Sequence, residues 1–214
     1  MTEPIYRGQM SESRQMGIIL SLAGGFLDAY TYVARGQVFA NAQTGNVVLL
    51  GLHMANGDFR GMQTYLIPIL AFLAGVLVAE LVRRHFRQRN RLHWRQVCVA
   101  MEIIALLAVA FFPQSRNMEA NLIVSFVCAL QVQSFRKLDG ITCATTMCTG
   151  NLRSAGDLLC QYWYTRDRER LQKSLRYFFV DAVFLAGAAV GVACVNLWGN
   201  KRCLSAAACY WWDF

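Results

Sequence analysis

Charged side chains are scarce in this sequence. Only 16% of its 214 residues are Asp, Glu, Lys or Arg, whereas an ordinary soluble domain has about 25%. Hydrophobic residues make up 56% of the chain. A soluble protein could place that much apolar sequence in its core, so the distribution of the apolar residues along the chain decides the class of protein.

Motifs of enzyme chemistry are also missing. The eight cysteines form no C-x-x-C pair, and the three histidines leave no zinc-binding pattern. The sequence has no His-Glu metal cluster, no nucleophile motif and no phosphate-binding loop of the P-loop type. We therefore expect no enzyme activity, no catalytic residues, no metal and no cofactor.

What the sequence does have is long apolar runs. They cover residues 16–33, 65–82, 97–112, 120–135 and 177–198. A helix needs roughly 20 mostly apolar residues to span the hydrocarbon core, which the first, second and fifth runs provide, whereas the third is marginal and the fourth is the weakest. The runs predict an all-α, polytopic helical membrane protein with five to seven membrane segments, forming one integral domain over residues 1–214 in a lipid bilayer.

The basic residues predict the orientation of these segments. Residues 83–95 contain six arginines and no acid, residues 166–176 form a second basic cluster, and Lys137 belongs to a smaller one. Lys and Arg mark cytoplasmic loops, so the net charge of +8 indicates membrane topology rather than a nucleic-acid partner. With no secretory signal in the polar N-terminal residues, we expect a cytoplasmic N-terminus and an external C-terminus.

The tripeptide Thr-Gly-Asn occurs twice, at residues 44–46 and 149–151. The first copy starts an apolar stretch that stops at Asn56, Gly57 and Asp58, and the second carries Arg153 and Asp157 in its first turns. Both stretches predict short or re-entrant helices, which are tolerated at membrane depth where protein or a water-filled cavity covers them. The alternative is that both cross the membrane fully, which would place one basic cluster outside.

The two tripeptides lie within a longer match. F-L-A-G follows each of them, at residues 72–75 and 184–187. The order in both halves is helix, turn, Thr-Gly-Asn segment, loop, helix with F-L-A-G. We interpret this as a duplication, with repeat 1 at about 16–83, a linking helix at about 96–112 and repeat 2 at about 120–198. The single linking helix would invert the second repeat, as in many transporters. The alternative is coincidence in a sequence rich in Leu, Ala and Gly.

The motif suggests a chemical role. Thr is a good N-cap, Gly allows close approach of the backbone, and Asn is both donor and acceptor. A helix that starts there would direct free N–H groups inward and favour an anionic or carbonyl-bearing solute. The alternative is structural capping alone. The predicted solute-binding residues are Asp28, Asn41, Gln43, Thr44, Gly45, Asn46, Thr149, Gly150, Asn151 and Arg153.

Asp28 is on this list because it is the most deeply placed of the ionisable residues in the apolar runs, where a charge is expensive. We expect Glu102 to extend toward Arg95 and Asp181 to lie near Arg176, both at the cytoplasmic end. Gly187 and Gly191 form a G-x-x-x-G spacing that would serve either internal packing or a homodimer interface.

Residues 24–51, "GGFLDAYTYVARGQVFANAQTGNVVLLG", resemble the signature of the YoaK-like family of bacterial inner-membrane proteins. The resemblance covers roughly residues 16–198. It implies a multi-pass fold, location in the inner membrane and no known activity. It marks the family-type positions Asp28, Phe39, Thr44, Gly45, Asn46 and Gly51.

Two functions remain open from the sequence. One is a transporter or channel for a small solute, an anion being one option, with the Thr-Gly-Asn segments at its centre. The other is a membrane scaffold, partner subunit or sensor that transports nothing.

Overall fold

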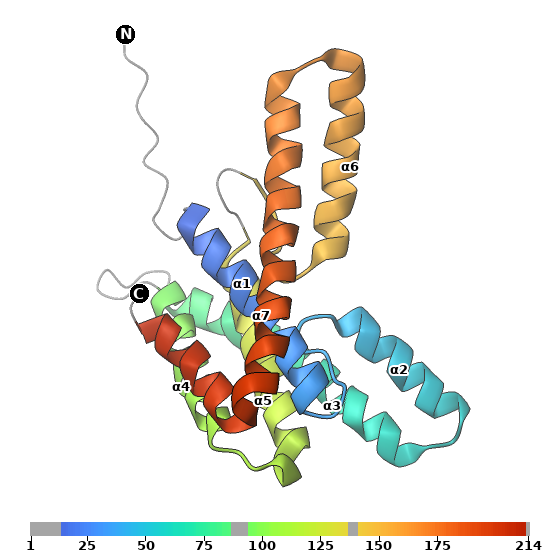
Figure 1. Cartoon of the computed structure of the whole chain (residues 1–214), viewed down its shortest axis with the longest axis vertical. Helices are drawn as coiled ribbons and strands as arrows, with labels where there is room; N and C mark the ends of the chain where they lie inside the picture. Colours follow the sequence, from blue (N-terminus) through green and yellow to red (C-terminus); the bar gives the residue numbers. More distant parts are fainter. Residues whose placement is uncertain (1–13, 87–93, 137–140, 213–214) are drawn as a thin grey trace.

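The computed structural model describes the backbone of residues 14–86, 94–136 and 141–212, and the side chains of these segments as far as residue 197. Residues 1–13, residues 87–93 of the first basic cluster and Lys137 lie outside the described residues. The described chain is helical almost throughout (Figure 1). Its elements are α1 (Arg14–Ala34), α2 (Gln43–Ala55), α3 (Phe59–Phe86), α4 (Trp94–Ala110), the 3₁₀ turn η2 (Gln114–Arg116), α5 (Asn117–Ser134), α6 (Cys148–Thr165) and α7 (Arg168–Trp212).

Among the described residues, three helices are long and apolar enough to cross a membrane: α1, α3 and the Arg168–Leu197 part of α7. Their large apolar side chains face outward as well as inward. On α3 the exposed ones form a stripe at helical spacing: Leu66, Leu70, Leu73, Leu77 and Leu81. Such a stripe suits contact with lipid and would be costly in water. The chain is therefore a polytopic helical membrane protein, as the apolar runs predict; α4 and α5, which carry the two weaker runs, are not among the three spans.

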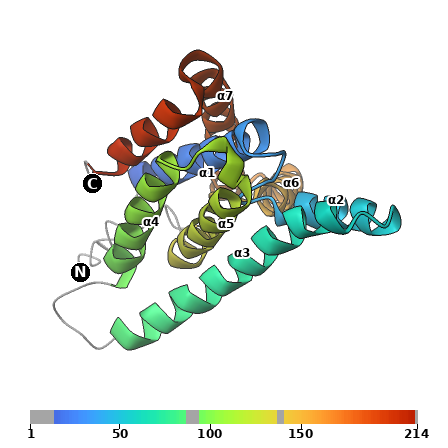
Figure 2. The same cartoon turned by 90° about the horizontal axis from the view of Figure 1, so that it is seen from below.

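Two pairs of helices form the body of the molecule. α1 packs along α7, and α3 packs along α5. The members of each pair run in the same direction, whereas α1 and α5 run in opposite directions (Figures 1 and 2). α4 closes the bundle against α5 and α7.

Glycine permits the close approach of helix backbones at both crossings. A Cβ on Gly187 would lie 2.1 Å from the carbonyl oxygen of Leu22 in α1. At the α3–α5 crossing, a Cβ on Gly75 would lie 2.4 Å from the carbonyl oxygen of Phe126. Gly191 also faces α1, so the G-x-x-x-G face of α7 serves packing inside the molecule.

The main core lies where α1, α4 and α5 meet. Tyr30, Leu106, Val109 and Val124 are almost completely buried there. Because lipid is as apolar as these side chains, close packing and hydrogen bonds contribute more to this core than hydrophobic burial does.

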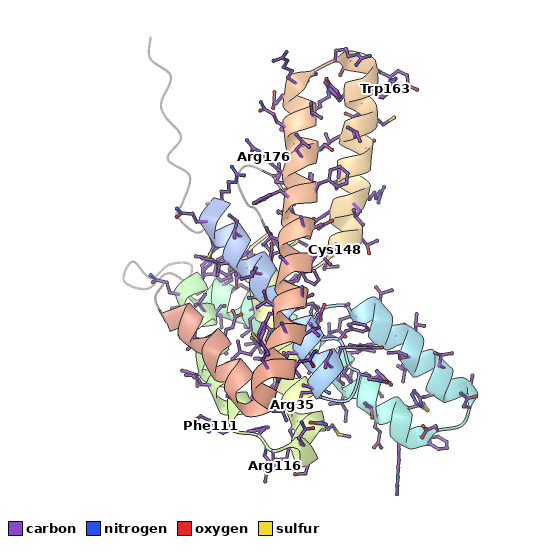
Figure 3. All side chains as sticks on the ribbon, viewed as in Figure 1. Arg35, Phe111, Arg116, Cys148, Trp163 and Arg176 are labelled. Atoms are coloured by element: carbon purple, nitrogen blue, oxygen red, sulfur yellow. The ribbon has the colours of Figure 1, made fainter. Side chains whose placement is uncertain are left out.

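A buried arginine joins three of the core helices at one end of the bundle (Figure 3). Arg35, just after α1, is 1% exposed. Its guanidinium donates to the Tyr30 hydroxyl and to three carbonyl oxygens, that of Val109 in the last turn of α4 and those of Phe112 and Pro113 just after this helix. A cation at the carbonyl end of a helix also opposes the negative end of the helix dipole.

Two helical hairpins extend from this body, α2–α3 and α6–α7 (Figure 1). The α2–α3 turn uses Gly57 at φ +67°, and α6 ends at Arg166 with φ +56°. α2 has 13 residues, as short as its sequence predicts, whereas α6 has 18. The α6–α7 hairpin projects beyond the N-terminal end of α1, and this places the second half of α6 outside the bundle (Figure 1).

Candidate functional site

The asparagines of the two Thr-Gly-Asn motifs make the same contact. The backbone N–H of Phe39 donates to Oδ1 of Asn46 at 3.0 Å, and Nδ2 of Asn46 donates to the carbonyl oxygen of Phe39 at 2.7 Å. Asn151 bonds the N–H of Ala144 at 3.3 Å and its carbonyl oxygen at 2.7 Å. In both halves the amide therefore holds the backbone of the residue seven positions earlier. We call these two contacts the asparagine clamps.

Each clamp fixes an extended segment against a short helix. Val38, Ala40 and Asn41 before α2 are buried, as are Cys143 and Thr145 before α6. Backbone in such a segment cannot form helical hydrogen bonds, and an unpaired peptide group is costly away from water. The asparagine amide supplies one acceptor and one donor at the place where the chain needs both.

The threonines of the motif do not cap these helices, contrary to the sequence prediction. α2 begins at Gln43 and α6 at Cys148, so Thr44 and Thr149 lie inside the first turns. The N-cap positions are Ala42 and Met147, and neither makes a side-chain cap hydrogen bond. A carboxylate from a long helix instead lies near the start of each of these helices.

At α2 this carboxylate is Asp28 of α1. It is 7% exposed, and its Oδ1 accepts the backbone N–H of Asn41 at 2.6 Å. The Asn41 side chain in turn donates to the carbonyl oxygen of Gly24 at 3.0 Å, which ties the segment back to α1. A carboxylate is stabilised at the N-terminal end of a helix by the unpaired N–H groups and the dipole there. The protein therefore places its own anion where we expected a solute.

At α6 the corresponding carboxylate is Asp181 of α7. Its Oδ1 accepts Nδ2 of Asn151 at 2.8 Å, and the thiol of Cys148 lies within electrostatic range. The other oxygen, Oδ2, is buried and has no hydrogen-bond partner among the described residues. Asp181 was expected near Arg176 at the cytoplasmic end of the helix. That expectation is wrong, because the clamp of the second half draws the carboxylate toward the start of α6.

A third acid is buried in α4. Glu102 is 1% exposed, and its Oε1 has no partner among the described residues. The expected extension toward Arg95 does not occur: the Arg95 guanidinium bonds the carbonyl oxygen of Ser134 instead. Glu102 and Asp28 both lie within electrostatic range of Cys128 in α5.

The remaining predicted site residues are divided between the interior and the surface. Gln43 donates to the carbonyl oxygen of Ala40 and accepts from Asn46, while Gly45 packs against the Phe39 ring. On the outside lie Thr44, Thr149, Gly150 and Arg153. The buried part of the predicted site is therefore Asp28, Asn41, Asn46 and Asn151, with Asp181 as an addition.

Residues that the sequence reading overlooked complete this polar interior. Nε2 of Gln131 in α5 donates to the carbonyl oxygen of Leu20 at 2.9 Å and lies 3.5 Å from the Thr145 hydroxyl. Asn121 donates to the carbonyl oxygen of Arg35. The signal was present, because both are amides within the fourth apolar run, where a polar side chain must find a partner.

Comparison with known proteins agrees with this architecture. The family model described as "Protein of unknown function (DUF1275)" matches residues 16–211. The chain belongs to this DUF1275 family. The chain is similar to the UPF0700 transmembrane protein YoaK of Bacillus subtilis (strain 168). The two sequences are 26% identical over 160 residues, which cover 72% of this chain and 68% of the relative. No solved structure matches the chain.

These comparisons confirm the resemblance to a YoaK-like family. They assign this DUF1275 protein to a membrane family whose activity is unknown. Any function must therefore be argued from the site itself.

Proposed function

We propose that this protein is a multi-pass transporter or channel for a small solute, located in the bacterial inner membrane. The observation that supports it best is the paired construction of the interior. Each half contributes one non-helical segment, one asparagine clamp and one helix that begins near an aspartate of a long helix. Interrupted helices that start near the middle of a membrane protein are typical of transporter sites.

The proposed inverted repeat agrees with the helix packing. The F-L-A-G glycine of each half packs on the first helix of the other half, Gly75 on α5 and Gly187 on α1. α1 and α5 run in opposite directions (Figure 1). A two-fold axis in the membrane plane would exchange these two crossings, as an inverted duplication requires.

The proposed orientation has the N-terminus in the cytoplasm. The α6–α7 hairpin that carries Arg166, Arg168 and Arg170 projects at the end where α1 begins (Figure 1). Basic residues remain on the cytoplasmic side, so that end faces inward. The α2–α3 turn would then face outward.

The buried acids suggest how a solute could move. Asp28 and Glu102 are buried and Asp181 has one buried carboxylate oxygen, and ionisable residues inside a membrane protein mark solute or proton pathways. Protonation of Asp28 would weaken its hold on the N–H of Asn41 and free the N-terminal end of α2. A small anion could then take the place of the carboxylate, which gives proton-coupled transport of an anion.

The decisive experiment is flux in proteoliposomes. An internal pH-sensitive dye would report proton uptake when short monocarboxylates, dicarboxylates, inorganic phosphate or amino acids are added outside. We expect a solute-dependent signal for the wild type and its loss in Asp28→Asn and Asp181→Asn. Asp157→Asn is the matched control, because Asp157 lies exposed on α6. Transport would be refuted if the whole panel produced no signal, or if all four proteins behaved alike.

Orientation has a separate test. Single cysteines at Gly57 and Arg166, in a background without native cysteines, would be labelled with a membrane-impermeant maleimide in intact cells and in inverted vesicles. We expect residue 57 to react from outside and residue 166 from inside. Labelling of both from one side would exclude the inverted arrangement.

One observation favours a second candidate, a scaffold or sensor that transports nothing. Oδ1 and Nδ2 of both clamp asparagines already bond protein groups, so neither amide is free for a solute. In that case no proteoliposome sample would show flux, whether it held the wild type or a variant. Asp28→Asn would change only the thermal stability of the protein.

A further inference from the structure

A cavity of about 300 Å³ lies between α1 and α7, and none of the residues of the asparagine clamps lines it. Its volume is at the lower end of the roughly 300–1,000 Å³ range of small-molecule sites. The lining residues are Arg14, Gly17, Ile18 and Ser21 from α1, Ile141 from the segment before α6, and Leu175, Arg176, Phe179, Val180 and Val183 from α7. This set, which we call the α1–α7 pocket, includes two cations and no acid among the residues that the structure describes.

Both cations belong to the end of the pocket nearest the start of α1. Arg14 is in the first turn of α1, with its guanidinium carbon 5.0 Å from the centre of the Phe179 ring. Arg176 approaches the same region from α7 (Figure 3). The positive end of the α1 dipole adds to the two charges. Two guanidinium groups are well suited to bind carboxylate or phosphate oxygens.

The remainder of the pocket is apolar with one polar exception. Ile18, Phe179 and Val183 are among the side chains that form its walls. Ser21 is fully buried, and its Oγ has no hydrogen-bond partner among the described residues. A buried hydroxyl without a partner is costly, and a bound molecule or water in the pocket would satisfy it.

The pocket is partly open at its side. Leu175 and Phe179 both line it and are 55% and 38% exposed. A ligand could therefore enter from the surrounding bilayer as well as from water, with its charge at the membrane interface.

We propose that the α1–α7 pocket binds an amphipathic monoanion. Its anionic head pairs with Arg14 and Arg176, and its short apolar body lies along Ile18, Phe179 and Val183 toward Ser21. Two sources supply this chemistry, a free organic anion and the headgroup region of an anionic phospholipid. The proposal does not depend on transport, since binding here requires no flux through the protein.

The test measures binding of radiolabelled hexanoate to the full-length protein in phosphatidylcholine nanodiscs. We expect saturable binding to the wild type and a loss of affinity of about tenfold or more in the double variant Arg14→Gln, Arg176→Gln. Arg116→Gln is the control, because Arg116 is an exposed arginine in η2 outside the pocket. Ile18→Trp should fill the pocket and also abolish binding while both arginines remain. Thermal unfolding of every variant confirms that it is folded.

A second arm identifies the source. Phosphatidylglycerol is added to the nanodiscs, and the lipid retained on the purified protein is measured by mass spectrometry. A lipid headgroup is supported if phosphatidylglycerol displaces hexanoate and if the wild type retains this lipid while the double variant loses it. Hexanoate binding that phosphatidylglycerol does not affect supports a free anion. The proposal is overturned if neither probe binds the wild type, or if both bind the double variant as tightly.

Discussion

Asn46 and Phe39 are joined by two hydrogen bonds between one side-chain amide and one peptide unit, at 3.0 and 2.7 Å. Asn151 and Ala144 repeat the arrangement 105 residues later, with the same separation of seven positions. The third motif residue, rather than the threonine, therefore connects each short helix to the segment before it. Asn suits this position because its amide matches the donor and acceptor of a peptide unit.

Replacement of a clamp asparagine should destabilise the protein strongly. Asn46→Ala leaves the N–H and carbonyl of Phe39 unpaired, at a cost of about 1–3 kcal/mol for each buried group. We expect the midpoint of thermal unfolding in detergent to fall by at least roughly 4 °C, because the two groups together cost about 2 kcal/mol or more and 1 kcal/mol shifts Tm by about 2–4 °C at this size. Asn151→Ala should behave in the same way.

The matched control for the clamp is Asn56→Ala. Asn56 is exposed and follows the last residue of α2. Its replacement should change Tm by no more than a degree or two. Equal Tm values for Asn46→Ala and Asn56→Ala would show that the clamp adds nothing to stability.

The crossing glycines should tolerate no side chain. Gly187→Ala would place a Cβ 2.1 Å from the carbonyl oxygen of Leu22, and Gly75→Ala one 2.4 Å from that of Phe126. Neither neighbour is a flexible side chain, so each helix pair must separate. Overpacking of this kind costs about 1–3 kcal/mol or more, which a fall in Tm would report.

Gly156→Ala controls for helix propensity. Gly156 lies within α6, and no atom lies within 4 Å of the position of its Cβ. Alanine in a helix is favoured over glycine by about 1 kcal/mol, so this variant should be slightly more stable than the wild type. If Gly187→Ala were stabilised to the same degree, the close α1–α7 crossing would be wrong.

The sequence predicted those parts of the architecture that are marked by a long apolar run or by a repeated motif. Apolar runs predicted the helices because a membrane span needs an uninterrupted length of apolar residues. The paired Thr-Gly-Asn and F-L-A-G motifs directed attention to the asparagines and to Gly187, both of which make specific contacts in the interior.

Contacts between distant segments could not be predicted in the same way. That Asp28 bonds the backbone of Asn41, and that Asp181 bonds Asn151, depends on how α1 and α7 cross the short helices. Asp181 was expected near Arg176 because the two residues are close together in the sequence. Two partners of Arg35, Val109 in α4 and Asn117 in α5, lie more than 70 residues away, and no local pattern indicates them.

Arg35 should be intolerant of lysine. Its guanidinium makes five hydrogen bonds, at 2.7–3.4 Å, with Tyr30, Val109, Phe112, Pro113 and Asn117. A lysine has only three donors on one nitrogen and cannot reproduce this planar arrangement. With hydrogen bonds to a charged group worth about 1.5–3 kcal/mol each, we expect Arg35→Lys to lower Tm by several degrees.

The comparison for Arg35 is Arg116→Lys at the same end of the bundle. Arg116 is exposed, so lysine should be neutral there. The variants are compared by thermal unfolding in one detergent. An Arg35→Lys protein as stable as Arg116→Lys would mean that charge alone, without the directed bonds, holds α4 to α1.

The α2–α3 turn should respond to acid through Asp58. The backbone N–H of Gly61 donates to its Oδ1 at 3.0 Å, and its Oδ2 lies 2.8 Å from Nδ1 of His53. The bond from Gly61 and, to a smaller extent, the bond with His53 lower the pKa of Asp58 below its ordinary value of 3.8. Because the folded state favours the carboxylate, the bonds stabilise the turn fully above pH 3.8 and are lost as pH falls through the lowered pKa. The amide resonance of Gly61, followed by NMR in micelles, should therefore shift with a midpoint below pH 3.8. In Asp58→Ala the shift should vanish, and a midpoint at or above 3.8 in the wild type would contradict the assignment.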